Sequence, residues 1–178
     1  MITRYIVLLR GINVGGNNII KMADLKTCFQ EMGFDSVVTY IQSGNVLFDS
    51  NEIDQSVLTQ QIENGLSDRF AYNSKVVLLT QQTLIQLVNN APTGFGADPE
   101  QYRYDFIFLK PPLTAEEALS KIKTKEDVDF VTAGDGVLYF CRLSAMSAQS
   151  QMSKLIGTAI YKEMTIRNLN TTIKLMHL

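Results

Sequence analysis

Two kinds of apolar spacing alternate along the first half of the chain. The unbroken apolar run Tyr5–Leu9 predicts a strand buried on both faces. Val37–Ile41 and Val46–Phe48 read as two further strands, and the turn residues Gln42–Asn45 between them predict a hairpin. Apolar residues three or four positions apart predict two helices, the first ending at Gly33: Met22, Leu25, Phe29 and Met32, then Leu58, Ile62, Leu66 and Phe70.

One more strand and one more helix complete this half. Val76–Leu79 is again apolar without alternation, which predicts a doubly buried strand. A helix is predicted around Thr83–Asn90, and Pro92 ends it. The predicted order is therefore β-α-β-β-α-β with one appended helix.

The same order returns in the second half. Tyr104–Leu109 predicts a strand, and Gly134-Asp135-Gly136 joins two more in a hairpin. Helical spacing is carried by Leu119 and Ile122, and then by Met152, Leu155, Ile156 and Ala159. Glu163–Arg167 predicts a last strand, followed by a helix that begins near Asn170 and buries Ile173 and Met176.

This repetition predicts an α+β fold made of a duplicated ferredoxin-like α/β plait, each copy carrying one appended helix. The expected domains are residues 1–91 and 103–178. Residues 92–102 hold two prolines and two glycines without periodicity, so they are the expected linker.

The topology brings two distant segments of the first domain together. A right-handed crossover makes the first two strands parallel, so both end at the same edge of the sheet. The loop Gly11–Asn18 follows the first strand and the turn Gln42–Asn45 follows the second. We therefore expect them to form one surface beside Arg10.

Composition narrows the classes of partner. Of 178 residues, 46% are hydrophobic and 19% are charged, as in globular proteins, and the net charge is −2. No positive field attracts nucleic acid, and the strands of the first plait lack the paired aromatics of RNA-binding plaits, so no nucleic-acid partner is expected. The apolar run near the start is too short for a signal peptide or a membrane span. Two distant cysteines indicate a reducing, cytoplasmic setting.

Candidate chemistry concentrates at the predicted edge. Gly11 and Gly16 have the spacing of a phosphate loop, but Asn17 and Asn18 stand where such a loop needs Lys and Ser or Thr. The loop is either a glycine-rich connection or an amide-rich cradle for an anion. Arg167 and Asn168 are a second candidate, since Arg can bind a carboxylate or phosphate and Asn168 or Asn170 can cap a helix. The candidate ligand-binding residues are Arg10, Gly11, Asn13, Gly15, Gly16, Asn17, Lys21, Gln42, Ser43, Asn45, Arg167 and Asn168.

Three segments closely resemble the bacterial family called domain of unknown function 1697. They are Leu8-Leu9-Arg10-Gly11-Ile12-Asn13-Val14-Gly15-Gly16, Lys21-Met22-Ala23-Asp24-Leu25 and Thr39-Tyr40-Ile41-Gln42-Ser43-Gly44-Asn45-Val46. Thr165–Thr171 resembles the closing signature of that family, and Ser153-Lys154-Leu155 resembles a weaker one. The resemblance implies a cytoplasmic bacterial protein of two α/β plaits with no assigned activity, substrate or catalytic residue.

The expected function is the binding of a small molecule or an anion at the edge formed by Arg10–Asn18 and Gln42–Asn45. The alternative is a non-catalytic module for protein interaction or dimerisation. Strands that are apolar on both faces need a cover on each face, and a second subunit of a homo-oligomer would provide one. No cofactor is indicated. A metal site is not expected, because His177 is the only histidine.

Overall fold

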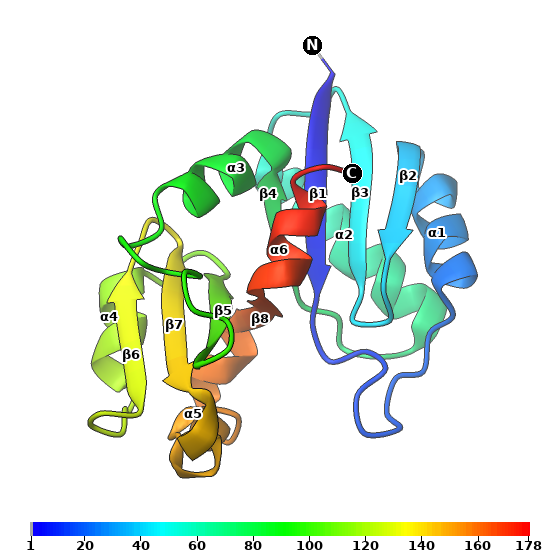
Figure 1. The fold of residues 1–178 in the computed structure, drawn as a ribbon. Coiled ribbons are helices and arrows are strands. Elements are labelled where there is room, and N and C mark those ends of the chain that lie inside the picture. Colours follow the sequence, from blue (N-terminus) through cyan, green and yellow to red (C-terminus); the bar gives the residue numbers. More distant parts are fainter. Residues whose placement is uncertain (1) are drawn as a thin grey trace. The chain divides into compact units, whose positions relative to one another are not determined.

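Two four-stranded antiparallel sheets organise the computed structural model, which describes residues 2–178 (Figure 1). The first sheet has the strand order β2-β3-β1-β4, and the second has the equivalent order β6-β7-β5-β8. Each is the sheet of a ferredoxin-like plait, so the predicted duplicated α+β fold is confirmed. The strands of the first sheet are β1 (Thr3–Leu9), β2 (Asp35–Tyr40), β3 (Asn45–Ser50) and β4 (Val76–Thr80).

The chain divides into two units. The first contains the residues up to Leu84 together with Leu175–Leu178, and the second is Ile85–Lys174. The division therefore falls inside α3 (Gln81–Asn89) and not at residues 92–102, and the last four residues return to the first unit.

In the first unit, α1 (Met22–Glu31) and α2 (Gln55–Phe70) pack on one face of the sheet. The core between them includes Tyr5, Phe29 and Phe48, whose rings stack or tilt against one another. Side chains on the other face of the sheet are buried as well: Ile6, Leu8, Leu47, Val77 and Leu79. The unbroken apolar runs thus correspond to strands covered on both faces, as predicted.

The second unit repeats this arrangement with β5 (Tyr102–Leu109), β6 (Asp129–Ala133), β7 (Val137–Leu143) and β8 (Met164–Asn168). The helices α4 (Ala115–Lys121) and α5 (Met152–Leu155) cover one face of its sheet. The other face carries aromatic side chains from β5 and β7: Tyr104, Phe106, Phe108 and Tyr139.

Two predicted helices differ in the structure. The helix expected over Met152, Leu155, Ile156 and Ala159 is shorter than predicted, because α5 ends at Leu155. Residues 144–149 before it and 159–163 after it form 3-10 helices. The extended backbone of Thr158, after Gly157, separates the pieces. In α6 (Leu169–Leu175), the predicted burial of Ile173 is also wrong, since Ile173 is 40% exposed and Thr171, Thr172 and Leu175 face inward.

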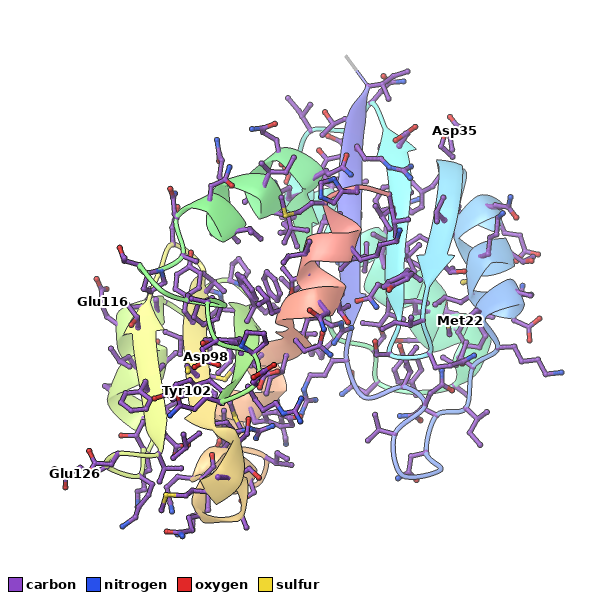
Figure 2. The ribbon with its side chains drawn as sticks, viewed as in Figure 1. Met22, Asp35, Asp98, Tyr102, Glu116 and Glu126 are labelled. Atoms are coloured by element: carbon purple, nitrogen blue, oxygen red, sulfur yellow. The ribbon has the colours of Figure 1, made fainter. Side chains whose placement is uncertain are left out.

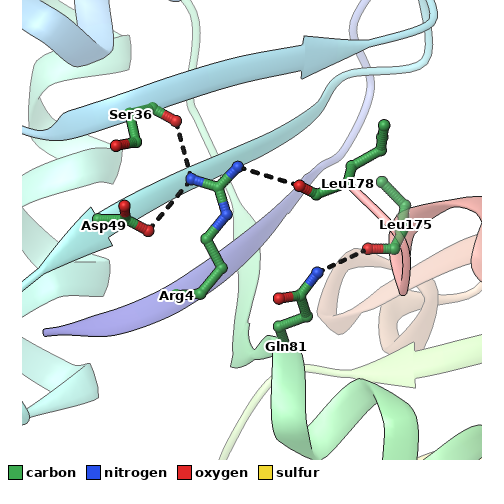
Figure 3. Close-up of polar contacts among 6 residues, drawn as sticks. All are labelled: Arg4, Ser36, Asp49, Gln81, Leu175 and Leu178. Atoms are coloured by element: carbon green, nitrogen blue, oxygen red, sulfur yellow. Dashed lines mark hydrogen bonds and ion pairs between the residues drawn. The ribbon is translucent and has the colours of Figure 1, made fainter.

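The returning segment Leu175–Leu178 is hydrogen-bonded to the first unit (Figure 3). The Gln81 side chain donates to the backbone oxygens of Leu175 (3.5 Å) and Met176 (3.1 Å). The Arg4 guanidinium donates to the backbone oxygens of Leu178 (3.4 Å) and Ser36 (2.8 Å), and it pairs with Asp49 (3.2 Å). These bonds make the last residues of the chain part of the first plait.

Candidate functional site

The predicted edge exists in the first unit, where β1 and β2 end at the same edge of the sheet on either side of β3. Both strands pair antiparallel with β3, so they are parallel to each other and their carboxyl ends share one edge of the sheet. The backbone amide of Leu9, the last residue of β1, donates to the oxygen of Gly44 at 2.8 Å. The loop after β1 and the turn after β2 therefore begin in contact.

The loop Arg10–Asn18 is a small hairpin. Val14 and Asn17 form an isolated antiparallel bridge, and Gly15 and Gly16 between them both have positive φ, 59° and 79°. Positive φ at both central positions is the conformation of a type I′ turn, which glycine adopts without strain. Gly15 and Gly16 are thus placed here by the needs of a tight turn.

Asn13 joins this loop to the turn after β2. Its Nδ2 donates to the oxygens of Gln42 (2.9 Å) and Ile20 (3.0 Å), and its Oδ1 accepts from the amide of Ile20 (2.8 Å). The φ of Asn13 is 52°, a left-handed conformation that Asn tolerates better than most residues. Because its carboxamide is used on three backbone groups, Asn13 fixes the shape of the edge.

The turn after β2 packs tightly against the base of the loop. Gly44 has a φ of 79°, and a Cβ placed there would lie 2.5 Å from Cδ1 of Ile12. Asn45 is fully buried, and its Nδ2 donates to the Tyr40 oxygen (2.9 Å) and to Ser43 Oγ (3.2 Å). Of the turn residues predicted to meet a ligand, Gln42 is exposed, Ser43 is half-buried and Asn45 is internal.

Three basic residues belong to the segments at this edge. Arg10 follows β1, and its backbone amide donates to the oxygen of Lys75, the residue before β4, at 3.3 Å. Lys21 is exposed and occupies the position before α1. An ammonium group has no acceptor atom, so Lys21 cannot bond the first amides of α1 as Ser or Asp would.

Arg167 and Asn168 belong to the second unit, at the end of β8. Arg167 is 7% exposed, its Nη1 donates to the Ile166 oxygen (2.9 Å), and burial lowers its pKa to about 10. Asn168 caps α6 through a bond from the Thr171 amide to its Oδ1 (2.8 Å), which decides between the two capping residues that the sequence left open.

Asn168 also lines a polar hollow of about 300 Å³ in the second unit, together with Arg103 and Arg142. Asp105 lies in the same hollow, 3.9 Å from Arg142 Nη2. Burial raises the pKa of this carboxyl, and the two guanidinium groups lower it by a smaller amount. These charged residues were not predicted from the sequence, because they lie on neighbouring strands that only the pairing of β5 with β7 brings together.

A second hollow in this unit, of about 270 Å³, is lined mainly by aromatic rings. It was missed because residues 92–101, expected to be part of a linker, fold onto the sheet. Tyr102 donates its backbone amide to Asp98 at 3.0 Å, so this segment leads directly into β5 (Figure 2). We call this cavity the aromatic hollow; its lining includes Phe95, Tyr102, Tyr104, Phe130, Thr132 and Cys141. The alternating aromatics at positions 102, 104, 106 and 108 were the available signal.

Neither cysteine has the environment of a reactive thiol. Cys28 is 3% exposed in the core of the first unit, as predicted, and burial raises its pKa. Burial, with a smaller contribution from Asp105, raises the pKa of Cys141 to about 11. Both thiols are protonated at neutral pH, which makes them poor nucleophiles.

Two other kinds of feature are absent from residues 2–178. Clusters of three or more His, Cys, Asp or Glu side chains suited to a metal ion do not occur among these residues. The same part of the chain contains no helix with the length and apolarity needed to span a membrane.

Comparison with known proteins identifies a family and a similar solved structure. A family model described as Protein of unknown function (DUF1697) matches residues 2–139, which include the three N-terminal motifs. The conserved bacterial protein SP0830 from Streptococcus pneumoniae has a similar solved structure, with a TM-score of 0.85 and 25% sequence identity. The match covers 99% of this chain and 98% of that protein. Among curated proteins, none matches.

Proposed function

Because the chain belongs to the family described as Protein of unknown function (DUF1697), we propose a function from the geometry of its first unit: the binding of a small anionic molecule at the loop–turn edge. This edge comprises Arg10–Asn18, Lys21 and Gln42–Asn45. The proposal rests on Asn13, whose side chain bonds the loop to Gln42 and fixes the surface before any ligand arrives. A surface fixed in advance loses less conformational entropy on binding.

Charge and exposure support an anion as the ligand. Arg10 and Lys21 belong to this edge, the backbone oxygen of Lys75 accepts from the Arg10 amide, and Gln42 is exposed. Gly15 and Gly16 are exposed and lack side chains, which lets a ligand approach their backbone. A phosphate or carboxylate group is the chemistry that basic side chains and backbone amides recognise.

The test is a titration of the full chain with inorganic phosphate, pyrophosphate and citrate, with glucose as a neutral control, followed by NMR of backbone amides. We expect the amides of Gly15, Gly16 and Gly44 to shift with the anions and not with glucose. Lys21→Ala should weaken binding several-fold, and rising salt should weaken it further. Lys26→Ala, an exposed lysine on α1, the helix that follows Lys21, is the matched control and should bind as the unchanged protein does.

Two results would contradict the proposal. One is the absence of shifts at this edge with millimolar anions. The other is an equal loss of affinity in Lys21→Ala and Lys26→Ala, which would show that only overall charge matters.

The alternative function, docking of a second copy of this chain, is favoured by a different observation at the same edge. Val14, Ile19 and Ile41 are large apolar side chains that are 65%, 77% and 44% exposed. A loop–turn edge that carries such residues is suited to isologous contact with the same edge of a second copy. Light scattering after size exclusion tests it: a dimer that Ile19→Asp converts to a 20 kDa monomer would support it, and a concentration-independent monomer would eliminate it.

A further inference from the structure

The aromatic hollow of the second unit has one preformed wall. Phe95 makes edge-to-face contacts with Tyr104, Phe106 and Tyr139, with ring centroids 5.0, 5.3 and 5.5 Å apart. Gly94 and Gly96 flank it with φ of +84° and +88°, and this left-handed backbone reverses the chain on either side of the ring. Phe95 is therefore held on the sheet by its neighbours in the unit.

Two further rings of the lining, Tyr102 and Phe130, remain partly open to solvent. Tyr102 and Phe130 meet edge to face at 6.2 Å, and Phe130 is 48% exposed although it is a large apolar side chain. Phe130 lies on β6, an outer strand of the sheet, opposite Cys141 of β7. A hollow of about 270 Å³ lined by these rings suits a ligand of one or two rings, because pockets for drug-sized ligands have volumes of roughly 300–1,000 Å³.

The lining is uncharged. Among the described residues that form the hollow, every side chain is apolar, aromatic or carries a hydroxyl or thiol group. The thiol of Cys141 stays protonated at neutral pH, since its pKa is about 11. Thr93 and Thr132 each offer one hydroxyl, which can donate or accept a hydrogen bond. A charged ligand would lose hydration here without gaining an opposite charge.

We propose that the aromatic hollow binds a neutral, planar heteroaromatic ring, of the size of an indole or a purine base, between Phe95 and the Tyr102–Phe130 pair. Aromatic faces on either side of a ring supply stacking and edge-to-face contacts. The threonine hydroxyls bond the polar edge of the ring. This site lies in the other unit from the loop–turn edge and takes a ligand of different charge, so the two proposals stand independently.

The same ring chemistry has two sources, a free small molecule or a base in a nucleic-acid strand. The lining favours the free molecule, because a strand brings phosphates and proteins that hold strands pair stacking rings with a basic groove. Tyr104, Phe106 and Tyr139, on the two central strands, are 8%, 0% and 3% exposed, so they are not available to stack successive bases.

The experiment uses the full chain with indole and adenine as probes and cyclohexanol as a non-aromatic control of similar bulk. We expect indole and adenine to shift the backbone amides of Gly94, Phe95 and Thr132, and cyclohexanol to leave them unchanged. Phe130→Ala should weaken indole binding about tenfold, the range found when one stacking ring is removed. Ile156→Ala removes another exposed apolar side chain of this unit and should bind indole unchanged.

Phe130→Leu keeps the apolar bulk, so it is the control for a loss of binding in Phe130→Ala that comes from a folding defect. If the leucine variant binds indole as weakly as the alanine variant while both keep the native spectrum, the ring itself makes the contact. Full binding by Phe130→Leu, equal binding of cyclohexanol, or no shift with millimolar indole would each overturn the proposal. If an oligoadenylate binds more tightly than adenine, and Phe130→Ala abolishes that binding, the proposal is overturned in favour of a nucleic-acid ligand.

Discussion

Gly44 and Gly16 have the same backbone φ, +79°, in different surroundings. A Cβ at Gly16 would meet no atom within 4 Å, whereas one at Gly44 would lie 2.5 Å from Ile12 and 2.9 Å from Leu9. The pair therefore separates two costs of replacing a glycine: backbone strain, which both positions share, and steric overlap, which only Gly44 has.

We predict that Gly16→Ala lowers the free energy of unfolding by about 1 kcal/mol, the cost of a left-handed backbone in a residue with a Cβ. Gly44→Ala should cost an additional 1–3 kcal/mol or so, because Ile12 and Leu9 must move. Urea denaturation of both variants measures the difference. Equal losses would mean that the turn can shift away from the loop, against the close packing described here.

Asp105 gives a stability prediction that depends on pH. Burial raises the pKa of its carboxyl, so the native state binds this proton more tightly than the unfolded chain does. The charged carboxylate therefore costs stability, and this cost grows as pH rises from the ordinary Asp pKa of about 3.9 through the raised native value.

Asp105→Asn should consequently be more stable than the unchanged protein near pH 7, with a gain that shrinks as pH falls toward about 4. Arg142, which loses its partner, is 30% exposed and can be hydrated instead. Denaturation curves across this pH range provide the measurement, with the exposed Asp135→Asn as the control. A variant less stable at neutral pH would show that attraction to Arg142 outweighs burial.

At the scale of elements, the loop Arg10–Asn18 and the turn Gln42–Asn45 behave as one piece. The Asn13 carboxamide spans them, and the Asn18 side chain closes the base of the loop on the Gly11 oxygen at 2.8 Å. Local hairpin chemistry explains the glycines, and the Asn13 side chain adds a direct hydrogen bond between the loop and the turn.

Asn13→Asp is predicted to separate the loop from the turn. Aspartate tolerates the left-handed backbone and keeps the oxygen that accepts from Ile20, but it loses the Nδ2 donor to Gln42 and Ile20. We expect a loss of roughly 1–3 kcal/mol in unfolding free energy, because backbone oxygens lose a partner. NMR relaxation should show faster motion at Gly15 and Gln42. Asn17→Ala, an exposed loop asparagine, should leave both unchanged.

At the scale of the molecule, the chain leaves the first unit through α3 and returns to it after α6. Gln81, the first residue of α3, is bonded to the returning segment at Leu175 and Met176. The C-terminal residues are thus held by side chains from the first plait.

We predict that Gln81→Ala loosens this segment while leaving most of the fold intact. The loss of these hydrogen bonds should cost about 1 kcal/mol. Hydrogen exchange of the peptide covering residues 170–178 should become faster by several-fold. Gln82→Ala replaces the exposed neighbour on the same helix and should exchange as the unchanged protein does. Unchanged exchange in Gln81→Ala would mean that the Arg4 bonds and the burial of Leu175 are enough to hold the C-terminal segment in place.

The sequence determined the order of elements and hence the fold class. Apolar runs such as Tyr5–Leu9 are long enough to identify strands buried on both faces, and the β-α-β-β-α-β order admits few right-handed topologies. The same reasoning placed the loop Gly11–Asn18 beside the turn Gln42–Asn45, because parallel strands end at one edge. Asn13 and Asn45 were named among the candidate ligand-binding residues of this edge, and the structure shows their carboxamides bonded to groups of the loop and the turn.

Tertiary structure decided what those residues touch. Periodicity alone cannot show that Asn45 points inward or that Ile173 is exposed, since both outcomes depend on the neighbours that packing supplies. The aromatic hollow forms because β5 and β7 pair in one register and Phe95 folds back over them. Its lining comes from residues up to 49 positions apart, Pro92 and Cys141. Contacts over such separations are fixed by the packing of the whole unit, which a local sequence pattern does not encode.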